Sequence, residues 1–254
     1  MSLEQMISVL TDKIEHHYYG KYRGLVVDNR DPEGLGRLKI RVPSVLGPDT
    51  VTGWATACVP FGGDANRGVF FVPEVGAGVW VEFEEGHLEF PIWVGTYWSK
   101  PRGESEVPKP VGADGVEEGQ VQDPPTAKII KTAKGHTLQF EDRDGDERIT
   151  LVEARHNHVL TMDVDGIALS HGTGGHSIAL TDSEVSVTTA SGATVTLTES
   201  GVTVDAGPGT VEVKGSAVRL GSASAPVIRI GDQGIGNLGA PVAMSVTTNT
   251  QVFA

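Results

Sequence analysis

The sequence is poor in cysteine, in basic residues and, over its second half, in aromatic side chains. Its 254 residues include a single cysteine, Cys58, so no disulfide can form within the chain. Lys and Arg number 20 against 33 Asp and Glu, and the net charge of -13 argues against binding to the phosphate backbone of nucleic acids. No apolar run approaches the roughly 20 residues of a membrane-spanning helix, and no basic-then-apolar leader opens the chain. These absences favour a protein that is made and folded in the cytoplasm.

The aromatic residues lie almost entirely in the first hundred positions. Thirteen of the fifteen Phe, Trp and Tyr residues fall between Tyr18 and Trp98, and only Phe140 and Phe253 follow. Large rings usually supply much of the buried area of a globular core. The region after Phe140 must therefore bury itself by another geometry, so we expect two architectures on one mainly β chain.

Residues 1–20 are expected to form an N-terminal helix. Ser2 and Gln5 match the capping box that begins many helices. The apolar residues that share one face of this helix are Leu3, Met6, Ile7, Leu10 and Ile14. This face either packs on its own domain or docks on a neighbouring protein.

Residues 21–98 have the pattern of a small barrel. Short β-rich runs, separated by Gly, Pro and Asp turns, cover 24–27, 38–42, 54–59, 69–72, 79–84 and 92–97. Five or six short strands in about 80 residues are typical of the oligonucleotide/oligosaccharide-binding (OB) fold. The four tryptophans, Trp54, Trp80, Trp93 and Trp98, could stack on bases or sugars, but in an acidic chain we assign them to the barrel core and to subunit contacts.

Residues 99–127 are expected to be a linker, because prolines stand there among Gly, Glu and Asp with little to bury. A catalytic domain could not fit inside so short a segment.

Residues 128–230 contain a repeat. Aliphatic pairs separated by one polar residue recur from Ile149/Leu151 onward, and the spacing gives a unit of two strands with a period of 16 to 18 residues. Such small side chains cannot close a wide core in one chain, but three chains intertwined into a triangular, β-helical prism can fill a narrow axis; a monomeric β-solenoid is the alternative. The expected trimer core consists of Leu160, Met162, Ile167, Leu169, Ile178, Leu180, Val185, Val187, Val195, Leu197, Val202, Val204, Val211, Val213, Val218 and Leu220. Residues 231–254 break the repeat and are expected to cap the distal end or to form a platform for a tip protein.

His156 and His158 are the candidate metal ligands. Two histidines at i and i+2 point to the same side of a strand, so three chains around an axis would bring six imidazoles together. Solvated surface histidines are the other interpretation. No nucleophile motif is present, and no cofactor other than this possible axial metal ion is expected.

Several motifs occur in an order that resembles a known family. The runs Tyr22–Gly24, Asp31–Pro43, Phe71–Gly76, Val79–Glu84 and Pro91–Gly95 resemble the phage baseplate assembly protein V family. Residues 135–149 resemble the segment that leads into the needle of type VI secretion spikes of the valine-glycine repeat G group.

This resemblance implies a homotrimeric central spike, with a barrel collar and a β-helical needle, that pierces the target cell envelope when the sheath of a contractile tail contracts. The implied partners are a separate baseplate hub protein, expected to contact the N-terminal helix, the tail tube and a tip protein of the proline-alanine-alanine-arginine type. The implied location is the baseplate of a virion or of an extracellular contractile particle. Two other functions stay open: a β-helical tail-spike hydrolase or lyase acting on glycans, and a binding module based on the barrel.

Overall fold

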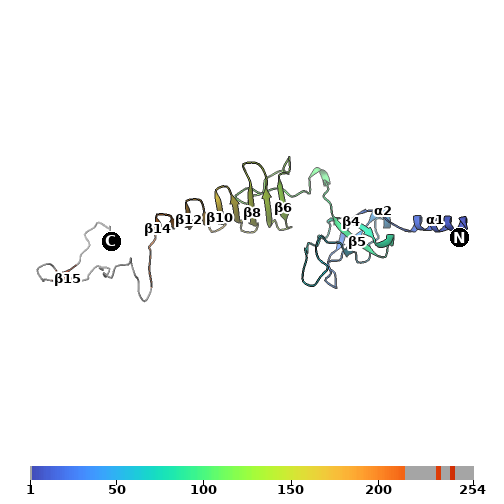
Figure 1. Cartoon of the computed structure of the whole chain (residues 1–254), viewed down its shortest axis with the longest axis horizontal. Helices are drawn as coiled ribbons and strands as arrows, with labels where there is room; N and C mark the ends of the chain where they lie inside the picture. The colour runs from blue at the N-terminus through green and yellow to red at the C-terminus, as the bar shows by residue number, and fades with distance from the viewer. Residues whose placement is uncertain (1, 215–232, 236–240, 244–254) are drawn as a thin grey trace. The chain divides into compact units, whose positions relative to one another are not determined.

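The computed structural model describes residues 2–214, 233–235 and 241–243, and it divides into two units between Ile167 and Ala168. Strands dominate the described residues, an N-terminal helix precedes them, and the expected mainly β fold class is confirmed (Figure 1). Over the described ranges, every helix is too short or too polar to cross a membrane.

Helix α1 (Leu3–His16) begins at the predicted capping box. The backbone N–H of Gln5 donates to Ser2 Oγ at 3.2 Å, and the N–H of Ser2 donates to Gln5 Oε1 at 2.9 Å. Along the helix, Leu3, Met6, Ile7 and Leu10 are all exposed. These four side chains therefore do not pack on their own domain, which was the first of the two interpretations of this face.

The first sheet forms the barrel of the OB type. Its strands are β1 (Tyr22–Asp28), β2 (Lys39–Arg41), β3 (Thr56–Ala57), β4 (Gly78–Phe83) and β5 (Pro91–Thr96), with short helical turns α2 (Pro43–Leu46), η1 (Glu84–Gly86) and η2 (Pro101–Gly103) between or after them. The strand order is β2-β1-β4-β5-β3, and β3 alone pairs in parallel, with β5. Isolated bridges from Leu38 to Ala55 and from Arg41 to Val51 bring the chain back beside β2, so the sheet curls on itself.

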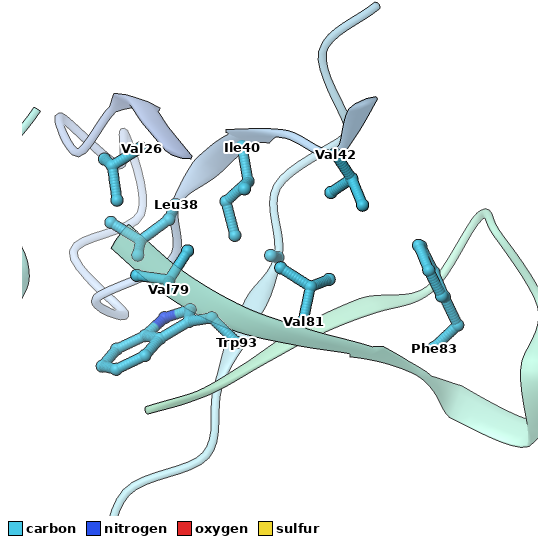
Figure 2. Close-up of a cluster of buried hydrophobic side chains, with 9 residues drawn as sticks. Val26, Leu38, Ile40, Val42, Val79, Val81, Phe83 and Trp93 are labelled. Carbon is cyan, nitrogen blue, oxygen red and sulfur yellow. The ribbon is translucent and has the colours of Figure 1, made fainter. Parts of the chain in front are cut away.

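The barrel core is built from alternating side chains of β1, β2, β4 and β5. In Figure 2, Trp93 lies with Leu38 and Val79 at one end of the cluster, and Phe83 lies at the other. Gly24 is required by this packing, because a Cβ there would lie 2.4 Å from Cγ2 of Ile40. The full set of buried residues is Val26, Leu38, Ile40, Val42, Ala55, Val79, Val81, Phe83 and Trp93.

The strand expected over residues 69–72 is wrong. Those residues follow a loop in which the N–H of Val69 donates to the carbonyl of Phe61, and the side chains of Phe70 and Phe71 are exposed. The run has the β-rich composition of a strand, but the barrel offers it no neighbouring strand with which to form a ladder.

The loop between β1 and β2 is organised by one carboxylate. Asp31 accepts backbone N–H groups from Glu33, Leu35 and Arg37, and Arg37 Nη2 donates to Asp31 Oδ1 at 2.7 Å. The Arg37 guanidinium, helped by these N–H groups, holds the pKa of Asp31 well below its ordinary value of 3.8. The side chain of Asp31 is 3% exposed, so this ion pair is part of the barrel structure.

Because the pKa of Asp31 is lower in the folded than in the unfolded chain, its contribution to stability is complete above the unfolded pKa and is lost as the pH falls below it. We expect Asp31→Asn to lower the melting temperature by several degrees at pH 7. The difference from wild type should shrink progressively below pH 3.8. Tryptophan fluorescence during thermal unfolding measures this, with Asp49→Asn, an exposed aspartate, as the control. A difference that stays constant from pH 7 to pH 3 would contradict the assignment.

The second sheet is an antiparallel meander in chain order (Figure 1). Its strands are β6 (Ala127–Lys131), β7 (Thr137–Glu141), β8 (Arg148–Glu153), β9 (His158–Asp163), β10 (Gly166–His171), β11 (His176–Leu180), β12 (Glu184–Thr188), β13 (Thr194–Thr198) and β14 (Gly201–Asp205). Strand β11 begins at residue 176 and β13 at residue 194, which agrees with the predicted two-strand period. Consecutive strands pair antiparallel in one sheet, so within the described residues the chain does not coil into a solenoid by itself.

The repeat ends earlier than predicted in the described residues. Val211 and Val213 are exposed and belong to no strand, which corrects the strand expected there; their expected place in the trimer core stays a prediction. Among the described residues, no further strand pairs with β14 on that side. Val218 and Leu220 lie outside the described residues, as does most of the expected distal cap. Within that cap, β15 (Gln233–Ile235) and β16 (Pro241–Ala243) pair antiparallel.

The expectation that residues 99–127 bury little is wrong for their second half. Val111 is 3% exposed and packs against Val152 and Val159 on one face of the β6–β9 strands. Both polar atoms of the buried Gln139 side-chain amide bond to the backbone of Val111. Oε1 accepts from the N–H of Val111 at 2.8 Å, and Nε2 donates to the carbonyl of Val111 at 2.9 Å. The chain thus covers this face with its own proline-rich segment, an effect of tertiary packing that composition alone does not reveal.

The two hydrogen bonds between Gln139 and Val111 can be used to test whether the proline-rich segment is held on this face. Gln139→Leu leaves two buried backbone groups of Val111 without partners, which costs about 2 kcal/mol. The segment should then open about 30-fold more often, and a glutamate-specific protease should cut after Glu118 correspondingly faster. Phe140→Leu, on the other face of the same strand, should leave the cleavage rate unchanged. Equal rates in wild type and Gln139→Leu would show that other contacts hold the segment.

Candidate functional site

The strands β6 to β9 of the first unit have two different faces. On one face Thr137, Gln139, Thr150, Val152, Val159 and Thr161 are buried. On the other, register pairs place Phe140 beside Ile149 and Leu151 beside Leu160. That second face also carries Ile130, Leu138 and Met162, by the alternation of each strand. It is aliphatic and largely open.

The strands of the second unit have the same alternation. Val185 pairs with both Leu180 and Leu197, and Val195 pairs with both Val187 and Val204, so aliphatic side chains run from strand to strand. Their exposed fractions lie between 37% for Val195 and 66% for Val202. The alternate positions carry Ser, Thr and Ala. We use the name aliphatic face for the aliphatic side of β6–β9 and, in the second unit, for that of β10–β14.

The aliphatic face contains most of the predicted core residues, and the structure adds others. Ile130, Leu138 and Phe140 lie on it, in β6 and β7, before the point at which the sequence-based core begins. Ile149 and Leu151, which opened the repeat, also lie on it. The alternation of residues 128–131 and 137–141 was a usable signal for the first three, but two strands separated by a turn were too few to show a period.

Such a face calls for a partner. Soluble monomers rarely expose a continuous aliphatic surface that spans many strands. Covering the exposed part of one of these side chains contributes about 1 kcal/mol, so a ladder of them provides a strong drive for association. No segment described in the structure covers this face.

The predicted metal ligands lie at the turn between β8 and β9. Glu153 pairs with His158 across the turn, and Oε2 of Glu153 lies 3.3 Å from Nδ1 of His156. The rings of His156 and His158 are nearly parallel, with centroids 5.4 Å apart. One ligand atom from each of the three residues lies within 4.8 Å of the others. Sequence reasoning missed Glu153, because only the turn brings it back to the histidines.

The donor set of this turn suits a transition metal. Two imidazoles and a carboxylate are ligands that zinc takes in proteins, with one position left for water. The backbone N–H groups of His156 and Arg155 donate to Glu153 and, with the nearby His156, lower the pKa of its carboxyl. The same bonds also stabilise the turn in which Asn157 has a φ of +55°.

The four tryptophans differ in their surroundings. Trp93 is buried, and its Nε1 donates to the carbonyl of Gly36 at 3.1 Å, so its place in the core is confirmed. Cations of the chain itself lie over Trp54 and Trp80: Lys39 over the first and Arg23 over the second. Trp98 is exposed and is not part of the core.

Comparison with known families agrees with both architectures. Residues 22–98 match the family described as the type VI secretion system/phage-baseplate injector OB domain. Residues 127–190 and 173–224 match the phage baseplate V C-terminal trimerisation domain. A barrel followed by a trimerising β-repeat defines a baseplate spike protein.

The chain belongs to the phage baseplate V spike family, and the two matches together span well over half of its residues. Both matched families are structural baseplate domains, and the family places the protein in a virion or a related injection particle. A search of curated proteins returned no significant match.

Proposed function

We propose that this protein is the central spike of a contractile tail or injection particle. Three copies intertwine through the aliphatic face into a β-helical prism, and sheath contraction drives this needle through the envelope of the target cell. The observation that carries the proposal is the aliphatic face itself, which lies within a match to a trimerisation domain and has no cover from the described parts of its own chain.

The chemistry of the chain supports a mechanical role over an enzymatic one. A glycan hydrolase or lyase needs paired carboxylates beside aromatic platforms for sugars. Between Phe140 and Phe253 the sequence has acids but no Phe, Trp or Tyr to serve as a sugar platform. A net charge of -13 likewise disfavours nucleic acid as a partner of the barrel.

The remaining partners follow from this role. A spike must be carried by a hub protein on the tail tube, and its distal end must meet the envelope directly or through a tip protein of the proline-alanine-alanine-arginine type. The chains would trimerise in the cytoplasm before they enter the particle, where the baseplate holds them.

The prism is tested by a matched pair of substitutions on neighbouring residues of β13. Val195 lies on the aliphatic face and Thr196 on the opposite one. By light scattering, wild type should have three times the chain mass of 26.8 kDa. Val195→Asp should reduce the mass to that of one chain, because three carboxylates would be buried near one axis. Thr196→Asp should remain trimeric.

Two outcomes would overturn this proposal. A soluble, fully trimeric Val195→Asp variant would show that the aliphatic face is not the shared core. A monomeric wild type would remove the needle altogether and would favour the barrel-based binding module.

We further propose that Glu153, His156 and His158 bind a divalent transition metal in each chain. After treatment with a chelator, wild type should bind one Zn²⁺ per chain in calorimetric titration. His156→Ala and Glu153→Gln should each weaken binding at least tenfold, because each removes one ligand. His171→Ala, which alters another neighbouring pair of histidines, should bind as wild type does. Absence of zinc binding, or binding that neither variant weakens, would leave these residues as a stabilised turn only.

A further inference from the structure

Helix α1 presents an apolar stripe that the described part of its own chain leaves open. Leu3, Met6, Ile7 and Leu10 have exposed fractions of 72%, 46%, 54% and 58%. The helix has 14 residues, a length of about 21 Å. Isolated helices of this length are marginal in water, and packing of the apolar face supplies most of their stability. The stripe therefore needs a partner for the helix to be stable.

The spacing of the stripe is that of a coiled coil. In the sequence, Leu3, Ile7, Leu10 and Ile14 are separated by four, three and four residues, which places them at alternating d and a positions of a heptad. Met6 then falls at position g, so the stripe is wider than a strict two-position seam. In a parallel arrangement, position g faces position e of the next helix, and here these are Met6 and Thr11. Neither is charged, so no like charges oppose the pairing.

The number of helices follows from the rest of the chain. Ile at a and Leu at d suit two strands when the helices are free to choose. Here the broader a/d/g stripe favours a bundle, and the same chain carries a trimerisation domain. Only residues 17–21 separate α1 from strand β1 of the barrel. A trimer therefore holds three copies of α1 close together. The resulting high effective concentration allows even a weak helix–helix interaction to form.

We propose that the three α1 helices of one spike pack against each other as a short parallel bundle through Leu3, Ile7 and Leu10. The occupant of the stripe is thus a second and a third copy of this chain, and the spike is fastened at its N-terminal end as well as along the needle. This inference rests on the proposed trimer. It differs from docking of α1 on a separate hub protein, in which the stripe would stay open in the isolated spike.

Cysteine cross-linking of the full-length protein tests the bundle. Cys58 is exposed and is first replaced by serine. Leu10→Cys places a thiol at the d position, and Ser8→Cys, exposed at the outward b position, is the matched control. With a short bis-maleimide, Leu10→Cys should give a covalent dimer in at least fivefold higher yield than Ser8→Cys. Ile7→Cys, at the a position, should give a yield similar to that of Leu10→Cys. Agreement between the two positions shows that the result does not come from a local effect of one substitution.

Light scattering on the same samples separates the possible failures. Trimeric samples with equal or negligible cross-linking at all three positions would overturn the bundle and leave the spike function intact. That result would favour docking of the α1 stripe on a separate hub protein. Monomeric samples would overturn the proposed trimer, and the bundle would fall with it.

Discussion

The aliphatic face is the main physical constraint on the strands from β6 to β14, because its side chains are exposed in the single chain. Each strand from β7 to β14 presents aliphatic side chains to one side, and the turns between them are too short to fold anything back over that side. Consecutive strands pair antiparallel in chain order, and no described segment folds back over this side. Association with other chains is therefore the way in which these side chains can leave water, in keeping with the match to a trimerisation domain.

The barrel follows the opposite strategy. It buries Trp93, Phe83 and a cluster of aliphatic residues within one chain, and it fixes the loop before β2 by the ion pair of Asp31 and Arg37. A barrel core buried within one chain, followed by strands that leave an apolar face exposed, suits the spike proposed above. The segment of residues 107–126 is intermediate, since it covers one face of the β6–β9 strands and leaves the aliphatic face for other chains.

The same physical logic applies to α1. Its stripe, like the aliphatic face, is apolar, regularly spaced and exposed in the single chain. Fastening three chains by helices at one end of the sequence and by interleaved strands over the other half would resist the splaying that an axial load produces. The histidines and Glu153 at the β8–β9 turn would add a local fixed point if they bind metal.

The sequence by itself determined the β class, the helix with its Ser2 cap, most of the barrel strands and the two-strand period, because each depends on local spacing and on turn residues. Features that depend on contacts between distant residues could be known only from the tertiary structure. Residues 69–72 have no neighbouring strand, and Val111 is held by two hydrogen bonds to Gln139. Phe140 lies on the aliphatic face beside Ile149, and the carboxylate of Glu153 lies close to His156. Those outcomes rest on contacts between residues far apart in sequence or on the path of a turn, and no periodicity in the chain encodes them.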